Sequence, residues 1–158
     1  MGKSELLMVL AGIALSIMIA LITIPTFTKG NDLAKISLIN SDISSIRKVS
    51  QTYVESRSPT GNFLGINAEA IGSLIPGLKT LRDIPNDASS SYFISSANEN
   101  IKYIIKSNAP YDTLILTIKG LNVIKDAEES ILKNQEKLNI NSTPDTPKDG
   151  EVVLHFKG

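Results

Sequence analysis

The chain has 158 residues, 42% of them hydrophobic, which suits one domain with an ordinary core and excludes a second large domain. Sixteen basic residues balance sixteen acidic ones, which excludes the strong positive field of a typical nucleic-acid-binding protein. There is no cysteine, which excludes a disulfide framework, a thiolate metal site and a cysteine nucleophile.

The N-terminal segment carries a long apolar run. Residues 6–24 read LLMVLAGIALSIMIALITI, nineteen residues without a charge. At roughly 1.5 Å per residue such a helix is about 28 Å long, close to the ~30 Å hydrocarbon core of a bilayer. We therefore predict a hydrophobic helix over residues 1–25 that serves as an assembly or transmembrane helix. The run is too long for the apolar core of a secretory signal peptide and lacks a small-residue cleavage site.

An amphipathic helix is predicted to follow over residues 26–56. Apolar residues recur at three- and four-residue steps, with charged and other polar side chains between them. The apolar positions are Leu33, Ile36, Ile39, Ile43, Ile46, Val49 and Tyr53; the polar ones are Asp32, Lys35, Asn40, Asp42, Arg47, Lys48 and Gln51. One face should lie against a domain and the other in water. Pro59 and Gly61 should end the helix.

The chain beyond residue 56 predicts a small antiparallel sheet. β-Branched and aromatic runs separated by Asn, Glu, Pro and Asp are typical of an antiparallel meander. The expected elements are an αβ-loop over 57–90 with a possible short helix in 67–74, a meander over 91–118, a helix over 121–138, a polar loop over 139–150 and a final strand over 151–157. In that last strand Val152, Leu154 and Phe156 alternate onto one face.

Together these elements predict an α+β fold. A long N-terminal hydrophobic spine helix continues into a C-terminal half that packs on an antiparallel β-sheet headgroup with one further helix. The predicted domains are the hydrophobic helix at 1–25 and the globular headgroup at 26–158.

Glu5 is a carboxylate placed directly before the nineteen apolar residues. Burying its charge without a partner would cost several kcal/mol. The first fifteen residues, MGKSELLMVLAGIAL, resemble the mature N terminus of type IV pilins. Those subunits are trimmed by a prepilin peptidase, begin with an N-methylated hydrophobic residue and carry a glutamate at the fifth position. The resemblance implies that Met1 is the processed terminus and that Glu5 pairs with the N-terminal amine of a neighbouring subunit.

The resemblance also implies a function: a structural subunit that polymerises as a homo-oligomer into a type IV pilus, a helical filament on the cell surface. Such a pilus supports adhesion, aggregation, motility or DNA transfer. Before assembly the subunit would lie in the inner membrane, with the prepilin peptidase and the pilus assembly machinery as partners. Met1 is more typical of type b than of type a pilins, whereas the absence of a C-terminal cysteine pair and the short chain depart from type b.

Other interpretations of the N-terminal segment stay open. Glu5 can be an interfacial carboxylate near Lys3, favoured by the helix macrodipole. A pseudopilin of a type II secretion-like system would share this N terminus. A non-polymerising membrane-anchored binding domain would leave Glu5 incidental to function.

Four further residues of the apolar helix are candidates for packing or melting. Gly12, Ser16 and Ala20 lie four apart, which is typical of a close helix-packing seam and also common by chance in membrane helices. Pro25 removes one helical hydrogen bond and crowds the carbonyl of Leu21, so a bend is expected near 21–25. In filaments of the resembling family the helix unwinds between a glycine and a proline, which implies melting between Gly12 and Pro25 here.

No catalytic residue, metal, cofactor or small-molecule substrate is predicted. The sequence holds no phosphate-binding glycine loop, nucleophile elbow or histidine pair for zinc. Asp83, Asn86 and Asp87 are interpreted as a plain turn in preference to a Ca²⁺ site. Asn141 fits a glycosylation acceptor pattern, and His155 is interpreted as a wet edge residue.

Overall fold

The computed structural model describes residues 3–137 and 149–157; the side chains of residues 6–7, 9–30 and 136–137 are outside that description. The chain divides into two compact units, Met1–Ala34 and Lys35–Gly158. The second unit thus begins at Lys35, whereas the sequence places the start of the headgroup at residue 26. Helix α1 spans Lys3–Ser56 and contributes residues to both units.

Within the described part of the chain, no helix combines the length and the apolarity needed to cross a bilayer. In the predicted hydrophobic stretch at 6–24, Met8 is the one residue whose side chain is described. The bend expected near Pro25 stays a prediction.

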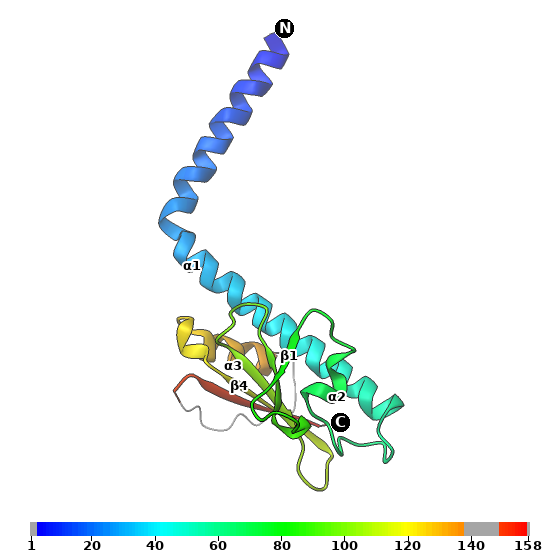
Figure 1. The fold of residues 1–158 in the computed structure, drawn as a ribbon. Helices are drawn as coiled ribbons and strands as arrows, with labels where there is room; N and C mark the ends of the chain where they lie inside the picture. The colour runs from blue at the N-terminus through cyan, green and yellow to red at the C-terminus, as the bar shows by residue number, and fades with distance from the viewer. Residues whose placement is uncertain (1–2, 138–148, 158) are drawn as a thin grey trace. The chain divides into compact units, whose positions relative to one another are not determined.

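The second unit is an α+β structure built on a five-stranded antiparallel sheet in the order β1-β2-β3-β4-β5 (Figure 1). The strands are β1 (Lys79–Arg82), β2 (Ser91–Ile94), β3 (Lys102–Lys106), β4 (Thr113–Lys119) and β5 (Glu151–Lys157). β4 and β5 form the longest ladder, running from the Thr113–Lys157 pair to the Lys119–Glu151 pair. The meander and the final strand predicted from the sequence are therefore confirmed.

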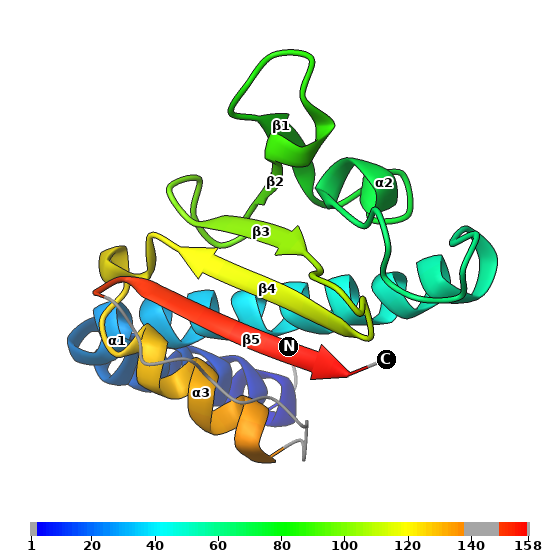
Figure 2. The ribbon, with the colours of Figure 1, turned by 90° about the horizontal axis from the view of Figure 1, so that it is seen from below.

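The core lies between one face of this sheet and the second half of α1, which crosses it in Figure 2. Because side chains alternate along a strand, one face of the sheet is apolar and buried. Its buried residues are Phe93, Tyr103, Ile105, Leu114, Leu116, Ile118, Val152, Leu154 and Phe156. From α1 the buried side chains include Ile36, Ile39, Ile43, Ile46 and Tyr53, as the helical spacing predicts. Arg47 adds a cation–π contact, its guanidinium 5.4 Å from the centre of the Phe156 ring.

The start of the predicted inward face needs a correction. Leu33 is 62% exposed, although the three- and four-residue spacing places it with the buried residues. Leu33 precedes Lys35, where the compact unit begins. The spacing rule therefore placed one residue too many on the buried face of the helix. The helix ends at Ser56, as predicted. The Tyr53 carbonyl accepts hydrogen bonds from the amides of Arg57 and Ser58 just beyond this end. The Tyr53 hydroxyl donates to the Leu64 carbonyl at 2.8 Å.

The segment 57–90 contains the short helix expected within 67–74 and one strand that was not predicted. Helix α2 (Ala68–Gly72) begins after Asn67, whose side chain accepts from the Ala70 amide at 2.8 Å. Strand β1 was missed because it is short and bears two charges among four residues, Lys79 and Arg82. It is held by its pairing with β2 rather than by local propensity.

The helix predicted over 121–138 is shorter than expected. Leu121–Val123 is a 3₁₀ turn, Ile124 is extended, and α3 covers Ala127–Lys137. Gly120 imposes the turn, because its φ of 84° is left-handed and a Cβ there would lie 2.2 Å from the Asn100 carbonyl oxygen. Leu121 and Ile124 are both buried in the core, and their three-residue spacing resembles that of one face of a helix. The polar loop predicted over 139–150 falls mostly outside the described residues.

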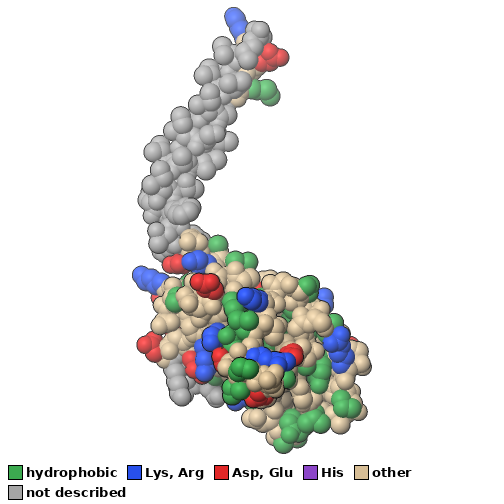
Figure 3. Space-filling model, in the orientation of Figure 1, with side chains coloured by type: hydrophobic (Ala, Val, Ile, Leu, Met, Phe, Trp, Pro, Cys, Tyr) green, Lys and Arg blue, Asp and Glu red, His purple; other side chains and the backbone are tan. Residues whose placement is uncertain are grey.

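Basic and acidic side chains are interspersed on the face of the second unit seen in Figure 3. This distribution agrees with the balanced composition of the chain. Two surface ion pairs join neighbouring elements: Arg82 of β1 with Glu69 of α2, and Lys102 of β3 with Asp83 at 3.6 Å.

Candidate functional site

Two residues were predicted for assembly, Met1 and Glu5, and four more of the apolar helix were predicted for packing or melting. Met1 is outside the described residues, and Glu5 is exposed in the first turn of α1. A carboxylate there is favoured by the partial positive charge of the helix N terminus. Gly12, Ser16, Ala20 and Pro25 belong to α1, but their side chains are outside the described residues. The predicted packing seam and the melting segment therefore stay predictions.

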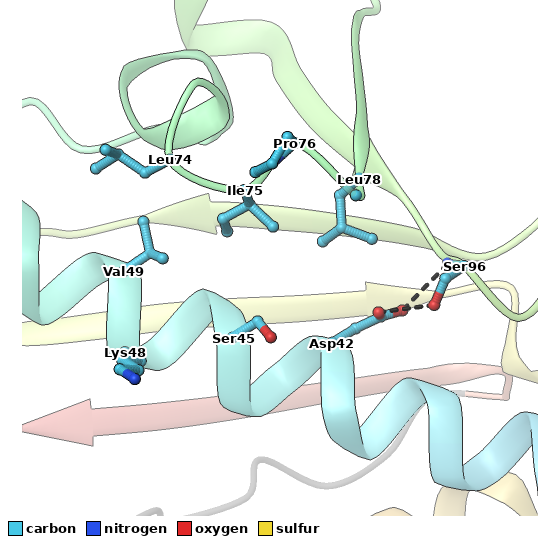
Figure 4. A pocket seen from close by; sticks show the side chains of 10 residues that line it. Asp42, Ser45, Lys48, Val49, Leu74, Ile75, Pro76, Leu78 and Ser96 are labelled. Atoms are coloured by element: carbon cyan, nitrogen blue, oxygen red, sulfur yellow. Dashed lines mark hydrogen bonds between the residues drawn. The ribbon is translucent and has the colours of Figure 1, made fainter.

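The second unit contains a groove between α1 and the loop that follows α2 (Figure 4). Its volume is about 510 Å³. The lining residues are Asp42, Ser45, Lys48 and Val49 of α1, Leu74, Ile75, Pro76, Gly77 and Leu78 of the loop, and Ser96. In Figure 4 the Val49 side chain points from the helix toward the loop, where Ile75 and Leu78 point back toward α1. The groove is thus walled mainly by aliphatic side chains, with Lys48 exposed at its helix side.

Asp42 closes one end of this groove. The residue is 8% exposed, and its carboxylate accepts hydrogen bonds from the Ser96 hydroxyl at 2.7 Å and the Ser96 amide at 3.1 Å. On the inner side, the Tyr103 hydroxyl donates to Asp42 Oδ2 at 2.7 Å, and the Ser95 hydroxyl lies 3.3 Å from the same atom. A buried carboxylate needs such donors, because an unpaired one would be strongly destabilising.

The environment of Tyr103 is apolar apart from this network. Its side chain is fully buried, and burial is the largest cause that raises the pKa of the phenol well above its usual value; the nearby charge of Asp42 raises it further. The phenol is therefore a permanent hydrogen-bond donor at ordinary pH. Both Asp42 oxygens are occupied by donors, so this arrangement ties α1 to β3 and the β2–β3 connection rather than offering a free base.

This network was missed from the sequence, which placed Asp42 on the wet side of the helix. The correction has a simple geometric cause: Asp42 is three residues after Ile39 and four before Ile46, so it lies at the border of the buried face. A polar residue at that border is a signal for a buried hydrogen-bonded group. Tyr103, in the middle of a strand, was the available donor.

The predicted turn at Asp83–Asp87 is confirmed by its own hydrogen bonds. Asp87 Oδ1 accepts from the Ser89 amide at 2.9 Å and the Ser89 hydroxyl at 2.6 Å, which caps the 3₁₀ turn Ala88–Ser90. These bonds hold the pKa of Asp87 below its usual range. Among the described residues no cluster of three or more His, Cys, Asp or Glu side chains is arranged to hold a metal.

Two candidates from the sequence remain. Asn141 lies outside the described residues. His155 is half-buried and alternates with the inward-facing Leu154 and Phe156 on β5, as strand geometry predicts.

No protein-family model, curated protein or solved structure matches this chain.

Proposed function

We propose that this chain is a structural subunit that polymerises into a type IV pilus filament. One observation carries the proposal: Glu5 stands directly before nineteen uncharged residues in a segment that resembles the mature N terminus of type IV pilins. In the filament, the apolar part of the spine helix would pack in the centre and the Lys35–Gly158 unit would face outward.

Assembly would place Glu5 beside the N-terminal amine of a neighbouring subunit. A lone carboxylate moved into an apolar filament core would cost several kcal/mol, which the N-terminal amine of a neighbouring Met1 would offset as an ion pair. The same pair would fix the axial position of each subunit, because only one depth of insertion brings both charges together. Contact between Glu5 and lipid headgroups would not fix the axial position of the subunit in this way.

The fold of the second unit supports this proposal. A subunit of such a filament needs a headgroup tightly joined to its spine helix. Here residues 36–53 of α1 supply part of the core, and the Asp42–Tyr103 hydrogen bond adds a polar tie. An α+β headgroup with an antiparallel sheet against the helix is what the resemblance implies.

Before assembly the subunit would reside in the inner membrane, held by the apolar helix at 1–25. Its partners there would be the prepilin peptidase and the pilus assembly machinery. Its final location would be the cell surface. The type b-like assignment belongs to the same proposal and rests on the order of elements.

A second candidate function is a membrane-anchored binding domain that does not polymerise. The groove beside α1 favours it, because its volume of about 510 Å³ lies within the range of small-molecule sites. Against it, the buried polar group in the groove, Asp42, is already saturated by protein donors.

Electron microscopy of surface fibres, with mass spectrometry of their subunit, distinguishes these functions. Our proposal predicts fibres composed of this chain whose first residue is an N-methylated Met1. Abundant, long fibres separate a pilin from a pseudopilin. Cells that make the chain without fibres, and detergent-purified chain that stays monomeric, would instead support the anchored binding domain.

A further inference from the structure

The turn between β1 and β2 presents an apolar tip. Among the described residues of Lys35–Gly158, Ile84 is the most exposed large hydrophobic side chain, at 57%. Pro85 follows it and is also exposed. Two adjacent apolar residues at a loop tip have no role in the core of their own chain.

This tip is held in one conformation by hydrogen bonds. The Ser90 hydroxyl accepts from the Ile84 amide at 2.9 Å and lies 2.8 Å from the Asp87 carbonyl oxygen. The Asp83 amide donates to the Ser90 carbonyl at 3.2 Å, and Asp87 caps the turn through Ser89. A loop that is already ordered loses little conformational entropy when it binds a partner.

Asp87 is the acidic side chain at the tip, and nearby Arg82 also attracts its carboxylate. Arg82 is joined to Glu69, and Lys102 to Asp83, in surface ion pairs. Asp87 forms hydrogen bonds with Ser89, which lower the pKa of its carboxyl.

The groove beside α1 is also apolar, but the charged side chain exposed beside it is basic. Its walls include Val49, Ile75 and Leu78, and it has room for more than one aliphatic side chain. Lys48 is its basic lining residue; it is exposed and forms no ion pair among the described residues. An apolar group accompanied by a carboxylate would suit this groove.

We propose that the Ile84–Pro85 tip of one subunit docks in the α1 groove of a second copy of this chain, with Asp87 facing Lys48. Groove and tip share no residue, so the contact is head-to-tail. A head-to-tail contact that does not close into a ring generates an open helical chain. The contact would link neighbouring headgroups in the filament, and to that extent it rests on the proposed function.

Site-directed disulfide formation tests this contact, because the chain has no native cysteine. Ser45→Cys lies in the groove and Ala88→Cys at the tip, and both positions are exposed. The two full-length variants are produced together in the same cells, and oxidised dimers are scored on membranes and on any fibres. A dimer should form when both are present and should be absent with either alone. Lys106→Cys, exposed at the end of β3, replaces Ala88→Cys as the matched control and should give no dimer.

Two further changes examine the chemistry of the contact. Ile84→Asp removes the apolar anchor at an exposed position, and Lys48→Glu reverses the charge in the groove. Each should reduce the cross-linked dimer about tenfold, as expected for an interface anchor. Thermal unfolding of both variants should match the parent chain, because neither side chain contributes to the core.

The outcomes separate this contact from filament formation. Fibres without the Ser45–Ala88 cross-link would overturn the docking proposal and leave the pilin function intact. The cross-link without fibres would support docking and contradict the pilin function. Absence of both would overturn both proposals.

Discussion

The phenolic oxygen of Tyr103 lies 2.7 Å from the carboxylate of Asp42, which joins strand β3 to helix α1 inside the core. The two residues are 61 positions apart in the sequence, so this bond helps to hold the spine helix on the sheet. A buried hydrogen bond to a charged group is among the stronger polar interactions in a protein.

Asp42→Ala should destabilise the headgroup, because it removes the charged acceptor that the Tyr103 hydroxyl and the Ser96 amide and hydroxyl share. We expect the free energy of unfolding to fall by roughly 1.5–3 kcal/mol. Urea unfolding of the full chain in detergent measures this loss. Tyr103→Phe should cost a similar amount, and the double variant should cost clearly less than the sum of the two. Additive losses would show that the two side chains do not act as a pair.

The buried phenol predicts an alkaline limit of stability. In the unfolded chain Tyr103 titrates near its ordinary pKa of 10.0, whereas burial raises the pKa in the folded chain above that value. Its contribution is complete below the unfolded pKa and is lost as pH rises above it, because the unfolded state then releases a proton that the folded state retains. Tyr103→Phe should be less stable at neutral pH but should lose stability less steeply above about pH 10. Parallel curves for the two proteins would contradict this account.

Ile43→Asp tests the inward face of α1. Ile43 is 1% exposed, and burial of such a side chain contributes roughly 1.5–3 kcal/mol before the cost of a buried charge is added. We expect the headgroup to unfold, as seen by circular dichroism and protease sensitivity. The neighbouring exposed Ser44 gives the matched control, and Ser44→Asp should leave the melting temperature nearly unchanged. Equal melting temperatures for both variants would refute the burial argument.

Much of the headgroup was predictable because its signals are local. The alternation in β4 and β5 and the helical spacing of Ile36 to Tyr53 each follow from one period of side-chain burial. Strand β1 was not predictable, because four residues with two charges form a strand only when β2 is beside them. Asp42 was misplaced for a related reason: its burial depends on Tyr103, which is remote in sequence. The position of Glu5 directly before the apolar run can be recognised from the sequence alone.

The apolar helix should loosen when the filament forms. Pro25 leaves the Leu21 carbonyl without a helical donor, and Gly12 lowers helix preference by about 1 kcal/mol relative to Ala. Unwinding is therefore easiest between these residues, and neighbouring subunits would shield the exposed backbone. A high-resolution filament map should show interrupted helical hydrogen bonding between Gly12 and Pro25. Unbroken helix from Leu6 through Tyr53 would contradict the prediction.

The most direct test of the central claim is the amount of surface fibre formed by Glu5→Ala. Glu55→Ala, at an exposed position in the same helix, is the matched control. Both variants should fold and insert in the membrane, because neither side chain contributes to the headgroup core. We predict that Glu5→Ala strongly reduces the fibres counted by electron microscopy, while Glu55→Ala keeps them at the wild-type level. Wild-type fibre levels from Glu5→Ala would contradict the assembly role of Glu5.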